Sequence, residues 1–153
     1  MKIESEKYEK LKWKPIYEEY VKMFKFENVL KDMDLEFFAN GKYKITAEKL
    51  FESKDAIFLD VRSKEEVESI AFPLRFQAEC IHIPTNEISD RLLEIPKDKP
   101  IGIFCSAGTR SAIVYAFLKT NGYDNVKIIV GGYGEIINML KPGKIWKAVK
   151  WIC

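Results

Sequence analysis

The sequence predicts an α/β domain, with a mostly parallel sheet flanked by helices, that carries an extra helical arm at its N-terminus. From about residue 44 onward, short apolar stretches of strand length alternate with segments of helical pattern. Capping and turn residues separate these stretches, whereas the first 43 residues show helical spacing alone. Strands that alternate with helices form right-handed β-α-β units, which build a parallel sheet. We therefore expect a helical extension over 1–43, the α/β domain over 44–141 and a C-terminal tail over 142–153.

The N-terminal arm repeats large apolar side chains at helical spacing. Pro15 suits the first turn of this helix, and Asp34 is placed to cap a second, shorter helix over 35–40 that ends at Gly41. The repeating side chains are Tyr17, Tyr20, Val21 and Phe24, followed by Phe26, Val29, Leu30 and Met33. One interpretation is that the arm packs on the main domain. The other is that its many aromatic side chains form a surface for homodimerisation or for a protein partner.

Each element of the α/β part has a local signal. Thr46 is a candidate N-cap, and Ser63 with Glu66 has the spacing of a capping box. Gly122 is placed to end a helix, and the glycine pair at 131–132 predicts a turn into the next one. In chain order the expected elements are a helix over 45–53, a strand over 56–61, a helix after Ser63, a strand over 80–84, a helix over 85–95, a strand over 100–105, a helix over 111–122, a strand over 125–130 and a helix entered from 131–140.

Composition and charge exclude several classes of protein. The 153 residues include 25 basic and 23 acidic side chains, and the two signs are interleaved rather than grouped as in a nucleic-acid-binding arm. No apolar run has the length of a membrane span and the first residues do not form a signal peptide, so we expect no membrane partner and a cytoplasmic location. The three cysteines are widely spaced and His82 is the only histidine, which argues against a disulfide framework and against a metal site.

The segment 102–122, GIFCSAGTRSAIVYAFLKTNG, places a thiol where a strand meets a helix. Cys105 ends the apolar strand, small or polar residues follow it, and Arg110 stands just beyond them. In open α/β sheets, ligands bind outside the carboxyl ends of the strands, so Cys105 is expected where such folds carry out their chemistry. Asp60 and Arg62 follow another strand and are expected at the same edge, either in support of this site or as an ordinary surface ion pair.

This loop has three means of lowering the pKa of the Cys105 thiol, of which only the ionised form attacks. The N-terminus of the following helix carries a partial positive charge and unpaired N–H groups. Small residues allow successive N–H groups to turn toward one anion, with Gly108 free to adopt a positive φ. Arg110 adds a fixed charge whose forked donors suit an oxyanion. The loop also contains three hydroxyl side chains, those of Ser106, Thr109 and Ser111.

The alternative for Cys105 is a buried structural cysteine before an ordinary strand–helix turn. We prefer the interpretation as a buried structural cysteine for Cys80. For Cys153 we prefer either that interpretation or an exposed terminal thiol. For Cys105, the strand-end position, the small residues and the arginine all favour a reactive thiol. The expected site therefore combines Cys105 with an anion cradle made by Ser106, Ala107, Gly108, Thr109, Arg110 and Ser111.

These residues resemble the rhodanese family of sulfurtransferases over roughly residues 45–140. The matching segments are FLDVRSKEEVE (58–68), IHIPTNEI (81–88) and the run over 96–132 that ends in the double glycine. The most specific piece runs from Cys105 through NGYDNV. The resemblance implies a rhodanese-like, mostly parallel five-stranded sheet flanked by helices, with the active-site loop beginning at Cys105.

By the same resemblance, Cys105 is the nucleophile of a thiosulfate sulfurtransferase. It would take the outer sulfur from a donor such as thiosulfate, become a persulfide and pass the sulfur to an acceptor, which is a thiol, cyanide or a protein. Arg110 and the N–H groups of 106–111 would hold the sulfonate of the donor. Asp60 would belong to the turn that borders the site. The resemblance implies no metal and no organic cofactor.

Loop length distinguishes the two chemistries of this fold. Sulfurtransferases resemble C-x4-R and dual-specificity phosphatases resemble C-x5-R, because the longer ring has room for a tetrahedral phosphate. Four residues separate Cys105 from Arg110, which favours sulfur transfer. The chain departs from the family pattern in three places: RFQAEC at 75–80 lacks the usual glycine and histidine, Tyr133 follows the double glycine where a tryptophan is frequent, and the N-terminal arm is additional.

Three other functions stay open on sequence grounds. The protein could be a binding module that has kept the fold and docks a protein through its arm. It could be an oxyanion enzyme, either a Cys-dependent phosphatase or an arsenate reductase. It could also be a redox sensor, which needs Cys80 or Cys153 within disulfide reach of Cys105. The sequence does not identify the physiological sulfur donor or acceptor.

Overall fold

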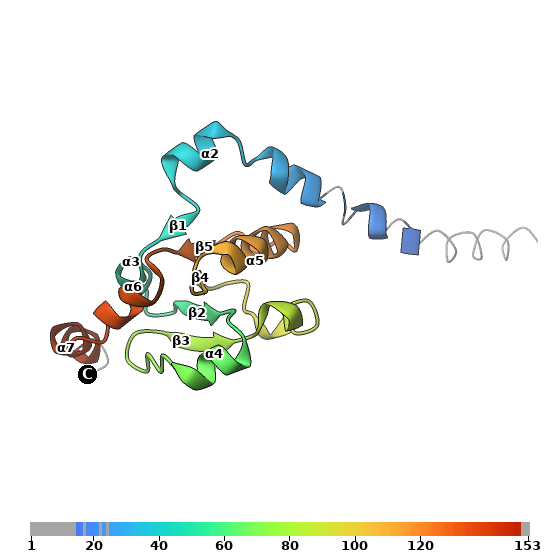
Figure 1. The fold of residues 1–153 in the computed structure, drawn as a ribbon. Coiled ribbons are helices and arrows are strands. Elements are labelled where there is room, and N and C mark those ends of the chain that lie inside the picture. The colour runs from blue at the N-terminus through green and yellow to red at the C-terminus, as the bar shows by residue number, and fades with distance from the viewer. Residues whose placement is uncertain (1–14, 17, 22, 24, 151–153) are drawn as a thin grey trace, which may run out of the picture.

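The computed structural model describes residues 15–16, 18–21, 23 and 25–150, and it has a five-stranded sheet at its centre (Figure 1). Every strand pairing in this sheet is parallel, in the order β1-β5-β4-β2-β3. The strands are β1 (Lys44–Ile45), β2 (Ile57–Asp60), β3 (Glu79–His82), β4 (Ile101–Phe104) and β5 (Val126–Ile129). The predicted fold class, a parallel five-stranded sheet between helices, is confirmed.

The helices lie between these strands and at both ends of the described chain. The α-helices are α2 (Leu35–Asn40), α3 (Ala47–Leu50), α4 (Lys64–Ser69), α5 (Thr109–Thr120), α6 (Gly132–Asn138) and α7 (Pro142–Lys150), and two 3-10 turns are η1 (Thr85–Glu87) and η2 (Leu92–Glu94). Before α2, the described residues are helical as far as Lys31. None of the helices in the described part of the chain is long and apolar enough to cross a membrane.

The capping signals read from the sequence are confirmed. Asp34 and Thr46 each cap a helix, and the side chain of each accepts a hydrogen bond from the N–H three residues later. Ser63 and Glu66 form the reciprocal capping box that starts α4. Gly41 ends α2 with a φ of 63°. These short-range bonds fix where the helices begin, and so they also fix the lengths of the loops between strand and helix.

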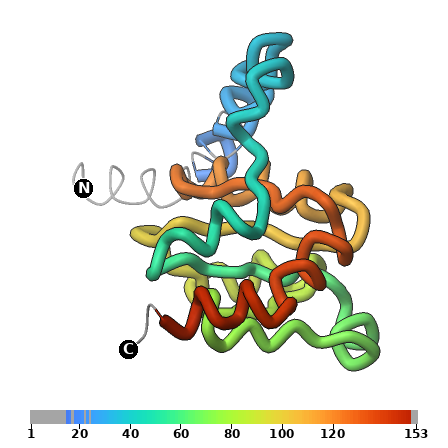
Figure 2. The backbone as a smooth tube through the Cα atoms, turned by 90° about the vertical axis from the view of Figure 1, so that its left-hand side faces the viewer, coloured from blue at the N-terminus to red at the C-terminus, as the bar shows by residue number. Residues whose placement is uncertain are grey.

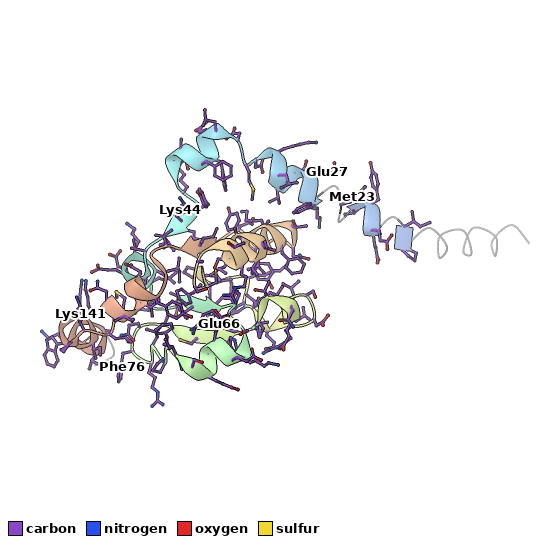
Figure 3. The ribbon with its side chains drawn as sticks, viewed as in Figure 1. Met23, Glu27, Lys44, Glu66, Phe76 and Lys141 are labelled. Carbon is purple, nitrogen blue, oxygen red and sulfur yellow. The ribbon has the colours of Figure 1, made fainter. Side chains whose placement is uncertain are left out.

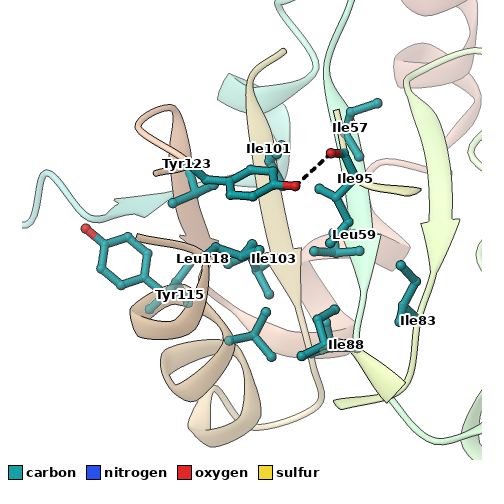
Figure 4. Packing of buried hydrophobic residues seen from close by; sticks show 14 of the residues in the cluster. Ile57, Leu59, Ile83, Ile88, Ile95, Ile101, Ile103, Tyr115, Leu118 and Tyr123 are labelled. Carbon is teal, nitrogen blue, oxygen red and sulfur yellow. Dashed lines mark hydrogen bonds between the residues drawn. The ribbon is translucent and has the colours of Figure 1, made fainter. Parts of the chain in front are cut away.

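One face of the sheet packs against α5 (Figure 4). Its buried side chains include Ile57 and Leu59 from β2, Ile101 and Ile103 from β4, and Val114 and Leu118 from α5. Burial of such branched apolar side chains stabilises the fold by about 1.5–3 kcal/mol each. Strands with continuous apolar runs are expected in a parallel sheet that is covered on both faces.

The opposite face of the sheet packs against α3, α6 and the segment 70–78. Gly102 in β4 is required by this packing, because a Cβ at that position would lie 2.3 Å from Leu50 Cδ2 and 2.9 Å from Ile129 Cδ1. Both neighbours are themselves buried. The missing side chain therefore allows α3 to approach the central strand closely.

The helix predicted over 85–95 is wrong, because this segment forms only the turns η1 and η2. Ile88 and Ile95 are buried in the α5-side core, which explains the helical spacing of the apolar residues. The hydroxyl of Tyr123 lies 2.9 Å from the carbonyl oxygen of Leu92 and 3.0 Å from that of Ile95. This contact holds the segment in an irregular path, so its apolar period reflects one buried side of a loop.

The N-terminal arm extends away from the domain (Figures 1 and 2). Its base is docked: Met33, Phe37 and Tyr43 pack against the α5-side core, and the rings of Phe37 and Tyr43 stack with their centroids 4.7 Å apart. The described residues before this base are exposed or half-buried, so the expectation that the arm packs on the main domain is wrong for them. The predicted contributions of Tyr17 and Phe24 lie outside the described residues.

The segment expected as a C-terminal tail contains helix α7. Lys144 on α7 forms an ion pair with Glu48 on α3. A cavity of about 670 Å³ lies between this helix and the chain that enters β3, with Phe51, Phe76 and Met139 in its lining. This cavity is near the amino ends of the strands, whereas Cys105 is at their carboxyl ends.

Candidate active site

Parallel pairing brings the carboxyl ends of the strands to one edge of the sheet. Asp60 at the end of β2 is in register with His82 at the end of β3 and with Phe104 at the end of β4. Cys105 is the first residue after β4, and it is 3% exposed. The double glycine at 131–132 follows β5 at the same edge. The strand topology therefore gathers at one place the segments that the sequence singles out.

The sulfur of Cys105 accepts hydrogen bonds from the backbone at the start of α5. The N–H of Gly108 lies 3.1 Å from Sγ, and the N–H of Ser111 lies 3.4 Å from it. Gly108 adopts a φ of 92°, which turns its N–H back toward the sulfur and which glycine adopts without strain. Small residues in this loop thus allow a tight ring of donors around one atom, as the sequence predicts.

These donors outweigh the effect of burial on the Cys105 thiol. Burial raises its pKa, but the Ser111 hydroxyl and the N–H groups of Ser111, Ala107 and Gly108 lower it, so that the pKa of Cys105 lies below the ordinary value for cysteine. The Ser111 hydroxyl is buried, and it forms no hydrogen bond of normal length and angle within the described residues. No other group in the described residues therefore competes with the sulfur for this hydroxyl.

Arg110 is held in an ion pair with Glu66, a residue that sequence reasoning treated only as part of a capping box. The Nη1 of Arg110 lies 2.5 Å from Glu66 Oε2, and its Nη2 lies 2.8 Å from Oε1 and 3.0 Å from Ser106 Oγ. The bound guanidinium lowers the pKa of Glu66 to about 2. Three of the five N–H donors of Arg110 therefore bond protein groups, and the ion pair ties the loop after Cys105 to α4.

Asp60 and Arg62 form a buried ion pair beside the site rather than an exposed one. Arg62 is fully buried, its Nη2 lies 2.5 Å from Asp60 Oδ2, and its Nη1 donates to the carbonyl oxygen of Ile70 and to the hydroxyl of Tyr133. The guanidinium also lies 5.3 Å from the ring centroid of Tyr133. Because Tyr133 lines the cavity at Cys105, this pair supports one wall of that cavity.

A cavity of about 550 Å³ opens at Cys105. Its lining includes Ser106, Ala107 and Gly108 from the loop, the double glycine after β5, and Tyr43 and Lys44 from the base of the arm. Gly132 approaches the loop so closely that a Cβ there would lie 2.9 Å from the carbonyl oxygen of Ser106. Gly132 is thus a packing requirement of the cavity, and a volume of this size suits a small ligand.

The remaining loop residues lie where the sequence places them, with different surroundings. Ser106 is half-buried and accepts a hydrogen bond from Arg110. Ala107 and Thr109 are exposed, and the hydrogen bonds to the sulfur come from Gly108 and Ser111 rather than from the hydroxyl of Thr109. Sequence reasoning missed Lys44, whose position in a two-residue edge strand has no local signal.

Cys80 does not lie within disulfide reach of Cys105. Phe58 is in register with Cys80 on one side and with Gly102 on the other, so Cys80 and Gly102 are two strand spacings apart, about 10 Å. Cys105 lies three residues beyond Gly102, directly after β4, and a disulfide requires Cα atoms within about 7 Å. Burial, with the charges of Asp60 and Glu79, raises the pKa of Cys80 to about 11. The redox hypothesis is thus wrong for Cys80, and Cys153 lies outside the described residues.

Within the described part of the chain, no group of three or more His, Cys, Asp and Glu side chains could hold a metal ion. The Nε2 atom of His82 lies 2.9 Å from the carbonyl oxygen of Arg62. The histidine therefore contributes to the turn after β2.

The structure thus places a hydrogen-bonded thiol of lowered pKa directly after the central strand of a parallel α/β sheet. A family model described as the rhodanese-like domain matches residues 45–139, and the chain belongs to this family. A curated sulfurtransferase of Allochromatium vinosum is 30% identical over 86 residues, which are 56% of this chain and 76% of that protein.

Solved structures agree with this assignment. A rhodanese-related protein from Thermoplasma volcanium has 30% identity and a TM-score of 0.52, covering 65% of this chain and 94% of that one. A rhodanese-like domain protein from Staphylococcus aureus has 34% identity and a TM-score of 0.50, and the match covers 61% of this chain and 89% of that one. Other curated relatives, tRNA sulfurtransferases among them, are longer, and the chain spans 15 to 28% of their length.

We expect Cys105 to be alkylated at neutral pH at least about a hundred times faster than Cys80, because its thiolate fraction is far larger. The rate of iodoacetamide modification at each cysteine, followed by peptide mapping from pH 5 to pH 9, measures this difference. Ser111→Ala should raise the pH at which the alkylation rate of Cys105 is half-maximal. Below that pH, the alkylation of Cys105 should be about two- to fivefold slower than in the wild type. Thr109→Ala is the matched control, and an equal effect of both substitutions would contradict the assigned role of Ser111.

Glu66→Gln should lower the free energy of unfolding by about 1–2 kcal/mol at pH 7, because it removes a half-buried ion pair. The pKa of Glu66 is depressed to about 2 in the folded protein, whereas its unfolded pKa is near 4.5. The contribution of Glu66 to the free energy of unfolding is therefore complete above pH 4.5 and is lost as the pH falls toward 2. The difference between variant and wild type, measured by urea unfolding, should therefore shrink between pH 4.5 and pH 2. A difference that is constant over this range would mean that the carboxylate charge is not responsible.

Proposed function

We propose that the protein is a sulfurtransferase that carries a sulfane sulfur on Cys105 as a persulfide, with thiosulfate as a donor. The observation that carries this proposal is the thiol itself: a cysteine of lowered pKa, held by N–H groups of Gly108 and Ser111 at the carboxyl edge of the sheet. Such a ring of donors stabilises a negative sulfur, whether thiolate or persulfide. Membership of the family and the likeness to curated sulfurtransferases support it.

In the first half-reaction, the Cys105 thiolate attacks the outer sulfur of thiosulfate. A new S–S bond forms at Sγ, the S–S bond of the donor breaks, and sulfite leaves with that electron pair. No proton has to move, so the site needs no general acid or base. The N–H groups of the loop then face the terminal sulfur of the persulfide anion, and this stabilisation drives the transfer.

In the second half-reaction, a thiophilic acceptor attacks the outer sulfur of the persulfide. Cyanide or a thiolate supplies the electron pair of the new bond, the S–S bond at Cys105 breaks, and its electron pair returns to Sγ as thiolate. A protein thiol is an equally suitable acceptor. The two half-reactions predict ping-pong kinetics.

Asp60 and Arg62 act in this proposal as positioning residues rather than as catalytic ones. Their ion pair is buried, and Arg62 reaches the cavity only through Tyr133. Arg110 likewise holds the loop in place through Glu66. The unpaired thiols of Cys80 and Cys105 are consistent with a reducing compartment, which supports a cytoplasmic location.

Incubation of the protein with thiosulfate should add one sulfur atom to Cys105, and a reductant should remove it. The measurement is an intact-protein mass spectrum with peptide mapping, followed by release of thiocyanate when cyanide is added. Cys105→Ser should abolish the added mass and the thiocyanate, whereas Cys80→Ser should change neither. Unmodified Cys105 in folded protein would overturn this proposal in favour of a binding module or of another oxyanion as ligand. Hydrolysis of an aryl phosphate that depends on Cys105 would replace it with oxyanion chemistry.

We also propose that the arm pairs with the arm of a second copy of this chain. Ile16, Tyr20, Met23 and Leu30 recur at intervals of four, three and seven residues, which is the period of a two-helix coil. Figure 3 shows Met23 and Glu27 on this helix, away from the domain. A helix of this length is marginal alone in water, so it needs a partner.

The exposed area of the arm fits a dimer interface. Seven large apolar side chains keep 42 to 85% of their surfaces exposed, namely those of Ile16, Tyr20, Met23, Phe26, Leu30, Leu35 and Phe38. Three of the seven, Tyr20, Phe26 and Phe38, are aromatic, and such side chains bury about 150–250 Å² each, so the exposed apolar area of the set is on the order of several hundred Å² per chain. A specific dimer buries about 800 Å² per partner.

The protein should therefore sediment as a dimer at micromolar concentration, and Met23→Asp or Leu30→Asp should make it a monomer. Lys25→Gln is the matched control, because it changes the charge by the same amount at a position off the apolar stripe. Alkylation of Cys105 should be unchanged in all three variants, which shows that the domain is intact. A monomeric wild type, or a dimer that survives both substitutions, would overturn the pairing of the arms.

A further inference from the structure

The site must bring two negative groups together. The thiolate of Cys105 is one, and the outer sulfur of thiosulfate, attached to a sulfonate, carries the other. Two like charges at contact distance repel strongly in a half-buried site, where water screens them poorly. A donor of this kind therefore needs a cation that faces the cavity and is not already neutralised.

The two arginines near the site are committed elsewhere. Arg110 is in a bidentate ion pair with Glu66, and its Nη2 also bonds Ser106. Arg62 is fully buried and paired with Asp60. Each arginine and its carboxylate together carry no net charge, so neither pair supplies the excess positive charge that the donor requires.

Lys44 lies at the cavity without such a partner. Among the described residues that line the cavity at Cys105, it is the one cationic side chain. It is exposed, its Nζ lies 5.0 Å from the ring centroid of Tyr43, and no ion pair to it is found in the described part of the chain. Figure 3 shows it on β1, where the arm joins the sheet.

The register of the sheet places Lys44 in line with the strand that carries the thiol. Lys44 pairs with Ile128 of β5, and Ile128 pairs with Ile103 of β4. Lys44 and Ile103 are therefore two strand spacings apart, about 10 Å between their Cα atoms. Cys105 follows Ile103 by two residues. A long lysine side chain at this edge can therefore reach into the space above the sulfur.

We propose that Lys44 is the specificity-determining residue that attracts and orients the anionic group of the sulfur donor at Cys105. This inference rests on the proposed sulfur transfer for its substrate, and it selects donors that carry a sulfonate or another fixed negative group. The backbone ring of the loop stabilises the reacting sulfur, whereas Lys44 binds the part of the donor that does not react.

A test that needs no sulfur transfer compares two alkylating agents of different charge. Iodoacetate is an anion and iodoacetamide is neutral, and both modify the same thiolate. Lys44→Gln should lower the ratio of their rate constants at Cys105 about fivefold at low ionic strength, and added salt should remove the difference. Lys42→Gln, an exposed lysine outside the cavity lining, is the matched control and should leave the ratio unchanged.

Steady-state kinetics then test the role in donor selection. Lys44→Gln should raise the KM for thiosulfate, a dianion, about fivefold with little change in kcat, and it should raise the KM for the methanethiosulfonate anion, which carries a single charge, by less. Lys44→Arg should restore most of the loss. An unchanged KM in an active Lys44→Gln variant would overturn the inference.

The two experiments separate the inference from the function it rests on. If the wild type transfers no sulfur but the alkylation ratio depends on Lys44, the proposed function fails and the anion site stands. If the wild type transfers sulfur and neither the ratio nor the KM depends on Lys44, the function stands and the anion site is overturned.

Discussion

The hydrogen bonds from the start of α5 to the sulfur of Cys105 are the constraint on which the rest of the site depends. A thiol that is 3% exposed would ordinarily stay protonated, because burial disfavours its charge. The N–H groups of Gly108 and Ser111 reverse this effect, but only if the chain turns sharply between strand and helix. The positive φ of Gly108 makes that turn, and Gly132 leaves room for it on the other side of the loop. Gly108 and Gly132 are therefore required so that backbone N–H groups can reach and stabilise a negative charge on the Cys105 sulfur.

Two ion pairs hold this arrangement in place, and they do so without adding charge. The pair of Arg62 with Asp60 is buried and carries its influence to the cavity through Tyr133, while the pair of Arg110 with Glu66 fastens the loop to α4. A bidentate pair fixes the position of a guanidinium well, because two parallel hydrogen bonds constrain both its distance and its plane. The contacts of Arg110 with Glu66 and Ser106 engage three of its five N–H donors. In our proposal, the two ion pairs position the loop, whereas Lys44 binds the anionic group of the donor.

The sequence is most informative where the physics is local. The caps at Thr46 and Ser63, the strands after them and the position of Cys105 directly after a strand follow from short-range patterns, and the structure agrees with them. The segment 85–95 was predicted wrongly because Tyr123, far along the chain, sets its path. The contact of Glu66 with Arg110 joins residues 44 positions apart, and each already has a local explanation. Such contacts have no periodic signal, so the sequence alone predicts the thiol and its loop but not the groups that balance their charge.

The position of the arm gives the site a component that the loop does not control. Phe37 of the arm stacks on Tyr43, and Tyr43 lines the cavity next to Lys44 on β1. β1 has only two residues and lies at the edge of the sheet, so its place depends on the docked base of the arm as much as on its pairing with β5. The loop and the ion pairs are fixed by the central strands and α5. The cavity wall that Tyr43 and Lys44 form is instead fixed by the same aromatic contacts that anchor the arm. Under the sulfur transfer that we propose, changes in the arm would alter which donor the cavity accepts without disturbing the environment of the sulfur.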